Sequence, residues 1–310
     1  MTTVSADSAP WEWSLEDLDD PAVFGPRDLL VDRALVRQHA YVHGTAEDLV
    51  CVSTGEVTPM VLASRLLRIY EERHQRHAEV GGLHLREALT FSSPVWLGEN
   101  VTIAGRFGGW YEGRNGACVV LDSEARGADG RLIARARTTE LLPEPPSEAP
   151  HRQPMPGLAR KVVPGPSSQG WAGAGLPPRH VSVGMTLPSM WRHLEQGQVS
   201  LYSGSASFER NLHTDATEAR ERGYPRPIAQ GMHLCGLVDE FCLRFFGTRW
   251  WMFGQFDVRF VAPTLADTTV EVGARVAGVR HDEGVRVVDL ELWTRTPDAV
   301  VMVGVASAPI

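Results

Sequence analysis

Positive charge is scarce in this chain. Its 310 residues carry 30 Lys and Arg against 38 Asp and Glu, which gives a formal net charge of −8 at pH 7, and Lys161 is the only lysine. Nucleic-acid-binding proteins need a basic face, and anionic membranes attract polybasic segments. No apolar run approaches the roughly 20 residues of a membrane span. We therefore expect neither a nucleic acid nor a membrane as partner.

Cysteine is also sparse. The four cysteines form no CxxC pair and show no metal-ligand spacing, so the sequence predicts no metal site. Cys235 and Cys242 lie two turns apart on one face of an expected helix, which favours buried free thiols in a reducing cytoplasm. The acidic first residues lack the apolar core of a signal peptide, so a cytoplasmic location is expected. No glycine-rich dinucleotide fingerprint is present, and no cofactor is predicted.

The chain repeats itself weakly but in register. Residues 91–94 (FSSP) are followed by Gly98 and Val101, and residues 260–263 (FVAP) are followed at the same spacing by Asp267 and Val270. Segments 116–121 and 284–289 align with nearly the same displacement along the chain. A shared displacement over successive segments indicates two copies of one unit.

Each copy is predicted to contain a polar lead-in, one helix and then alternating strands. The helices are expected over 59–77 and 227–246. Period-2 patterns predict strands at 102–107, 117–125, 132–141, 255–261, 269–279, 285–294 and 300–306. A helix wrapped by an antiparallel meander is the hotdog plan, so the expected class is α+β, a double hotdog in which the two sheets run together.

Composition sets the expected domain limits. Residues 143–178 contain ten prolines and five glycines and are predicted to be a linker. Residues 1–20 are expected to form an N-terminal arm, 21–142 the first hotdog and 179–310 the second. Because a fused pair already supplies two hotdog units, a monomer or a homodimer of fused hotdogs is expected.

Residues 202–238 hold the most informative stretch, a polar loop with a histidine followed by the start of an apolar helix. Its motif positions are Tyr202, His213, Asp215, Ala219, Gly223, Tyr224, Pro227, Ile228, Gly231 and Met232. At this spacing the stretch resembles the signature of the MaoC-like (R)-specific enoyl hydratase family. The spacing from Tyr202 to His213 is closer to fused hydratases that resemble mesaconyl-CoA and itaconyl-CoA hydratases.

The resemblance implies roles for several residues. His213 is expected to transfer protons at the β-carbon of an acyl thioester, because an imidazole titrates near neutrality. The Gly231 N–H at the helix start is expected to bind the thioester oxygen, with Gln230 as a further donor. Tyr202 is expected to contact the substrate, and Asn211 to assist catalysis by a hydrogen bond to the substrate or to His213. Simple packing of His213 or Gly231 is the alternative, and Asp215 is predicted to cap a helix.

One position departs from the family pattern. The place of the family's catalytic Asp falls on Phe208, and the nearest carboxylate is Glu209. Glu209 is therefore the predicted replacement acid, with a solvated surface Glu as the alternative, and Phe208 is the predicted pocket residue. In the first copy, Tyr41 and His43 stand at the matching lead-in without a Gly-Met helix start, so this copy is expected to be degenerate and to form a pocket wall.

Three functions follow from the sequence. The leading prediction is a hydratase/dehydratase, a lyase acting on an acyl thioester bound to CoA or to a carrier protein. The missing Asp leaves open a fold repurposed for cyclisation of a polyketide-like substrate in natural-product biosynthesis. A non-catalytic acyl-binding protein is the third possibility, because fold likeness alone does not decide among these functions.

Overall fold

The computed structural model describes residues 23–73, 82–142, 144–145, 152, 162–167, 181–204, 210–282 and 284–310. The predicted N-terminal arm and most of the predicted linker lie outside these residues. Within the described ranges, no helix is both long enough and apolar enough to cross a membrane.

The first half of the chain begins with a strand and two helices and ends in a meander. Its elements are β1 (Val23–Leu30), α1 (Arg33–His43), α2 (Glu47–Val50), β2 (Glu56–Val57), η1 (Pro59–Leu62), α3 (Ala63–Arg73), β3 (Leu83–Phe91), β4 (Val95–Trp96), β5 (Asn100–Gly113), β6 (Gly116–Gly127) and β7 (Leu132–Leu142).

The second half repeats this order, again with two lead-in helices. Its elements are β8 (Met190–Leu194), α4 (Gln196–Tyr202), α5 (Ala216–Glu221), α6 (Gly231–Phe246), η4 (Gly247–Arg249), α7 (Trp250–Phe253), β9 (Gln255–Phe260), β10 (Thr268–Asp282), β11 (Val285–Arg295) and β12 (Val300–Pro309).

The two halves correspond along the chain as predicted. The central helices α3 and α6 begin at Ala63 and Gly231, and β5 and β10 begin at Asn100 and Thr268, so both pairs of elements are displaced by the same distance in sequence. The predicted strands all lie within β5, β6, β7 and β9 to β12, apart from one residue at the end of β9. The internal repeat therefore marks a structural duplication.

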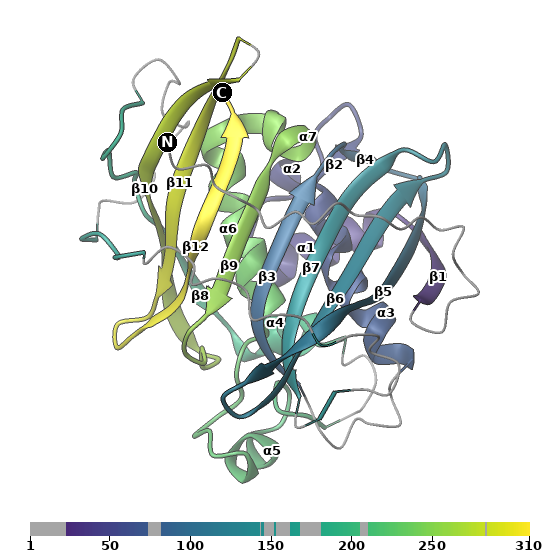
Figure 1. The fold of residues 1–310 in the computed structure, drawn as a ribbon, viewed down its shortest axis with the longest axis vertical. Helices are drawn as coiled ribbons and strands as arrows, with labels where there is room; N and C mark the ends of the chain where they lie inside the picture. Colours follow the sequence, from purple (N-terminus) through teal and green to yellow (C-terminus); the bar gives the residue numbers. More distant parts are fainter. Residues whose placement is uncertain are drawn as a thin grey trace.

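The strands form one sheet in the order β1-β5-β6-β7-β3-β9-β12-β11-β10-β8. Each strand of the first half has a counterpart in the second, and the counterparts lie at equal distances from the two edges of the sheet. The halves meet at the centre, where β3 pairs with β9. That antiparallel pairing runs from Arg86 opposite Arg259 to Thr90 opposite Gln255. In Figure 1 the sheet spreads across the molecule with α6, α1 and α3 on one side of it. The chain is a double hotdog, and the prediction that the two sheets run together is confirmed.

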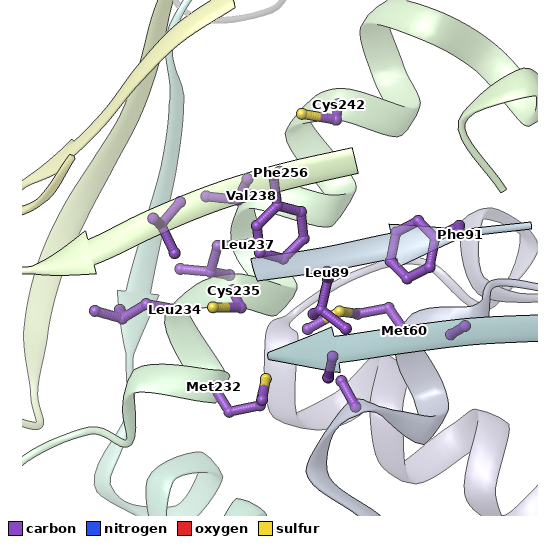
Figure 2. Packing of buried hydrophobic residues seen from close by; sticks show 14 of the residues in the cluster. Met60, Leu89, Phe91, Met232, Leu234, Cys235, Leu237, Val238, Cys242 and Phe256 are labelled. Carbon is purple, nitrogen blue, oxygen red and sulfur yellow. The ribbon is translucent and has the colours of Figure 1, made fainter. Parts of the chain in front are cut away.

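Helix α6 forms the centre of the core. Fourteen of its sixteen residues are buried, so the helix is enclosed by the core on nearly all sides. Figure 2 shows Leu237 and Val238 of α6 close to Phe256 of β9, within the same cluster as Leu89 of β3. Burial of this apolar surface stabilises the fold by roughly 25 cal/mol per Å². Cys235 and Cys242 are buried free thiols, as predicted.

The predicted start of this helix at Pro227 is wrong. The backbone from Pro227 to Gln230 is not helical, because Ala229 N–H donates to Thr264 O and Ile228 bridges to Leu265. In the first half, residues 59–62 form a 3₁₀ turn before α3 begins at Ala63. The first half is therefore helical from the predicted start, whereas α6 begins one turn later than predicted.

The polar lead-in of the first half has more regular structure than the sequence pattern indicated. It contains the edge strand β1, which pairs with β5, and the helix α1, whose first turn is capped by Asp32. The Asp32 carboxylate accepts a 2.8 Å hydrogen bond from Leu35 N. Only one face of α1 is apolar, so the helix was not predicted from a segment in which polar residues predominate.

A short described part of the predicted linker lies across the second half of the sheet. Ser167 Oγ donates to Glu271 Oε2 at 2.8 Å, and Arg295 Nη1 donates to Gly165 O at 3.0 Å. Glu271 and Arg295 are paired across β10 and β11. The domain boundaries stay a prediction.

Candidate active site

A cavity of about 330 Å³ opens between the two halves. Helix α3 and the start of β3 contribute one side of its lining, and the residues before and at the start of α6 contribute the other. Its lining residues include Ser64, Leu67, Arg68, Leu83, His84, Glu140, Tyr202, Leu212, His213, Tyr224, Ile228, Gln230, Gly231, Met232, Leu234 and Phe260. The structure thus brings together His213, Gly231, Gln230 and Tyr202, four of the residues singled out from the sequence.

His213 has one ring nitrogen committed to the protein. Its Nδ1 lies 2.8 Å from Ile228 O. A carbonyl only accepts hydrogen bonds, so Nδ1 carries the proton and Nε2 carries the lone pair in the neutral ring. Burial lowers the pKa of His213, the Ile228 carbonyl raises it, and the positive Arg222 lowers it, with a net decrease. The neutral ring is therefore favoured, and Nε2 is available as a base.

Asn211 holds the loop that carries His213. Its Oδ1 accepts from His213 N–H at 2.8 Å, and its Nδ2 donates to Ser203 Oγ at 3.2 Å. Asn211 is not among the residues that line the cavity. Its side chain positions the loop by an Asx-type turn, and the catalytic role expected from the sequence stays a prediction.

Asp215 caps the next helix, as predicted. Its carboxylate accepts from Thr217 N at 2.8 Å and Glu218 N at 3.1 Å, and it pairs with Arg210 at 3.0 Å. These hydrogen bonds and the guanidinium charge lower the pKa of Asp215 to about 2. Asp215 is thus fixed at the start of α5, and it does not line the cavity.

Gly231 stands where the backbone must approach its neighbours closely. A Cβ added at this position would lie 2.8 Å from Phe260 Cζ and 2.9 Å from His84 Nδ1, closer than real contacts allow. The first N–H groups of a helix have no partner within the helix. The helix dipole adds partial positive charge at this end, so the N-terminus of α6 can hold a carbonyl oxygen.

Gln230 and Tyr202 also line the cavity. Gln230 is the N-cap of α6, and its Nε2 donates to Val199 O at 3.3 Å, so its amide holds α4 against the start of α6. Tyr202 stacks on His233 with ring centroids 4.7 Å apart. His233 is itself anchored by Nε2 at 2.7 Å from Val42 O in the first half.

His84 is a site residue that the sequence reasoning missed. It lies at the start of β3, and its Nε2 is 3.0 Å from Glu87 Oε2 and 3.1 Å from Arg86 O. Glu87 is fully buried and also accepts from Thr138 Oγ1 at 2.7 Å. The His84 ring packs on Phe260, with centroids 4.6 Å apart. The imidazole is thus fixed on both sides at the cavity edge.

A β-bulge brings His84 and Glu87 to the same face. In a regular strand, residues three apart point to opposite faces. Here β3 pairs His84 with Glu140 and Arg86 with Thr139, so Leu85 is the extra residue. A bulge of this kind re-aims the side chains that precede it. Strict alternation would place His84 and Glu87 on opposite faces of the strand, so the sequence pattern could not predict that they meet.

The other predicted residues lie elsewhere. Phe208 and Glu209 fall outside the described residues. Tyr41 and His43 of the first half do not line the cavity: Tyr41 is exposed, and the His43 ring packs against His233 and Tyr202. The wall that the first half supplies comes from α3 and β3 instead.

Residues 181–293 match the family model of the MaoC like domain. A search of curated proteins finds no match. A solved structure named MaoC-like dehydratase is similar at 17% identity with a TM-score of 0.70, over 94% of this chain and 98% of that one.

Two further solved structures agree in fold. A MaoC-like dehydratase from Phytophthora capsici is 13% identical with a TM-score of 0.65, over 95% of this chain and 99% of its own. A Mycobacterium tuberculosis protein described as a double hotdog is 16% identical with a TM-score of 0.60, over 93% of this chain and 95% of its own. At these identities the likeness establishes the fold.

Proposed function

We propose that the protein is a hydratase/dehydratase, because residues 181–293 match the MaoC like domain and lie within a double hotdog. Its reaction is the addition of water to, or its removal from, the β-carbon of an acyl thioester. The thioester is carried by CoA or by a carrier protein. The family match and the geometry of the cavity support this proposal together.

The observation that carries the proposal is the placement of His213 beside the start of α6. Nδ1 of His213 is held by Ile228 O, shortly before the N-cap Gln230, and both His213 and Gly231 line the same cavity. Water addition to an unsaturated thioester needs a base for the water and a group that stabilises the developing oxyanion, and the site supplies a candidate for each.

In the direction of hydration, Nε2 of His213 takes a proton from a water molecule whose oxygen then bonds to the β-carbon. The electrons of the double bond move toward the thioester, the Gly231 N–H stabilises the negative oxygen that develops, and protonation of the α-carbon completes the addition. In the direction of dehydration the α-proton is removed, and the same imidazole, now protonated, gives its proton to the leaving hydroxyl group. The lowered pKa of His213 keeps it in the basic form that hydration needs.

The lining of the cavity suits an acyl chain. Leu67, Leu83, Leu234 and Phe260 present apolar surface, and Arg68 provides a positive charge on α3. Arg68 Nη2 donates to Ser203 O at 2.6 Å, which ties α3 to the loop after α4. An apolar cavity with few polar groups is typical of small-molecule sites.

The test is direct incubation of the full chain with crotonyl-CoA and with longer and branched enoyl-CoA thioesters. Loss of the absorbance of the unsaturated thioester, with formation of the 3-hydroxyacyl product by mass spectrometry, is the expected result. The His213→Ala variant should lose about 10²–10⁴-fold in kcat, whereas His193→Gln, at an exposed histidine on β8, should keep full activity.

Failure of every enoyl thioester, over the pH range in which the chain is folded, would contradict the proposal. Full activity of a folded His213→Ala variant would leave a hydratase but remove the role given to His213. Circular dichroism of each variant establishes that a loss of activity is not a loss of structure.

A further inference from the structure

Water addition transfers two protons, one away from the water oxygen and one to the α-carbon, and His213 serves only the first of these. We propose that His84, supplied by the first half and held by Glu87, is a catalytic residue that gives a proton to the α-carbon in hydration and removes it in dehydration. This inference rests on the proposed function and adds a second catalytic group to that site.

Position is the first argument. Nδ1 of His84 faces the start of α6, 2.9 Å from where a Cβ on Gly231 would lie. In the proposed reaction the Gly231 N–H binds the thioester oxygen, and the α-carbon is two bonds from that oxygen. A group that abuts Gly231 is therefore close to the α-carbon, while His213 serves the β-carbon from the loop before α5.

The location of the proton is the second argument. Nε2 of His84 faces two acceptors, Glu87 Oε2 and Arg86 O, so Nε2 carries a proton in either charge state. The proton that can be exchanged is therefore on Nδ1, the atom that faces Gly231. His213 has the opposite arrangement, with Nδ1 committed and Nε2 free to act.

Charge is the third argument. Burial lowers the pKa of His84, but the hydrogen bond and the negative charge of Glu87, with the charge of Glu140 on β7, outweigh burial and raise it. Phe260 on β9 packs on this ring and Gly231 on α6 approaches it, and neither carries a charge. At His213, Arg222 at the end of α5 opposes protonation, and His233 on α6 lies within electrostatic range. The resting site thus pairs an acid with a base, as separated pKa values do in acid–base catalysis.

The reaction balances with these two groups. His213 takes one proton from water, and the water oxygen bonds to the β-carbon. The resulting enolate takes one proton from Nδ1 of His84 at the α-carbon, and the thioester carbonyl re-forms. His213 ends with one proton more and His84 with one fewer, and exchange with solvent restores both.

The experiment measures kcat and KM against pH for the wild type, His84→Gln, Glu87→Gln and the surface control His193→Gln, on the enoyl-CoA that the wild type hydrates fastest. We expect His84→Gln to lose about 10²–10⁴-fold in kcat with KM changed only a few-fold. The wild-type rate should fall at alkaline pH as His84 loses its proton. Glu87→Gln should move that fall to lower pH, and His193→Gln should leave the profile unchanged.

The outcomes separate the two proposals. A wild type that hydrates thioesters, together with a His84→Gln variant of unchanged kcat and pH profile, would overturn the role of His84 and leave the proposed function standing. A wild type inactive on every thioester would overturn both. If His84→Gln does not fold, Glu87→Gln decides the question, because a merely structural Glu87 would not shift the alkaline limb.

Discussion

Thr58 in the first half donates a 3.1 Å hydrogen bond to the carboxylate of Asp239 on α6 of the second half. The other oxygen of Asp239 accepts from Trp250 Nε1 at 2.7 Å. Burial raises the pKa of Asp239 to about 7 despite these two hydrogen bonds, which lower it. A carboxyl group in the core therefore changes charge near neutral pH at the contact between the halves.

This carboxyl makes stability depend on pH. Because its folded pKa is raised from 3.8 to about 7, the native state binds the proton more tightly than the unfolded chain. Its contribution is complete below about pH 4 and is lost as the pH rises through about 7. Asp239→Asn keeps an oxygen for Trp250 and an N–H for Thr58 but does not ionise. Relative to this variant, the wild type should lose about 2–3 kcal/mol of unfolding free energy between pH 5 and pH 8. Urea unfolding at the two pH values measures the difference, and parallel pH slopes for the two proteins would show the prediction to be wrong.

Gly231→Ala should reduce activity far more than stability. The added methyl group would lie within 3 Å of Phe260 Cζ and His84 Nδ1, so the imidazole must move away from the helix start. We expect a loss of about 10²-fold in kcat, the size seen when a catalytic group is misplaced by about 1 Å. The matched control is Gly197→Ala in α4, where the new Cβ meets only the Tyr41 hydroxyl at 3.7 Å. Equal activity of the two variants would contradict the close approach at Gly231.

The loop bearing His213 should depend on the oxygen of Asn211. Asn211→Ala removes the acceptor of His213 N–H and the donor to Ser203 Oγ, so we expect a loss of about 10- to 100-fold in kcat. Asn211→Asp keeps the acceptor, and the Ser203 hydroxyl can donate to the new carboxylate. The Asp variant should therefore retain most of the activity. Steady-state rates for both variants check this, and an Asp variant as poor as the Ala variant would point to a direct role of the carboxamide in catalysis.

Shortening a buried side chain of the central helix should lower the stability of the fold. Leu237 is fully buried on α6, close to Phe256 in Figure 2. Leu237→Ala should lower the free energy of unfolding by about 2–5 kcal/mol, because it removes apolar contacts and leaves a cavity. Val285→Ala, at a position 43% exposed, should change it by about 0.5 kcal/mol or less. Similar losses at both positions would mean that α6 is not the centre of the core.

The internal repeat made the fold predictable. Alternating residues predicted β5 to β7 and β9 to β12 but not β3, and the recurrence of FSSP as FVAP with the segments that follow aligned the two halves. The start of α6 was misplaced because the hydrogen bond from Ala229 N to Thr264 O joins segments that are distant in the chain, and no local pattern records such a contact.

The candidate site was predictable only where its residues belong to one continuous motif. His213, Gly231, Gln230 and Tyr202 share that motif and were found together. His84 belongs to the other half of the chain, and its approach to Gly231 depends on the β3–β9 pairing and on the bulge at Leu85. Asn211 lay within the motif, but only its hydrogen bond in the folded chain shows that its carboxamide holds the backbone of His213.

The joining of the two hotdogs in one chain removes a constraint that identical subunits share. In a symmetric dimer every side chain appears twice, so a residue fitted to one cavity is also imposed on its symmetry-related position. Here Ala63 begins the helix of the first half where Gly231 begins that of the second. The first half therefore contributes His84 to the cavity and the second contributes the glycine at its helix start, and a substitution in one half is not imposed on the other.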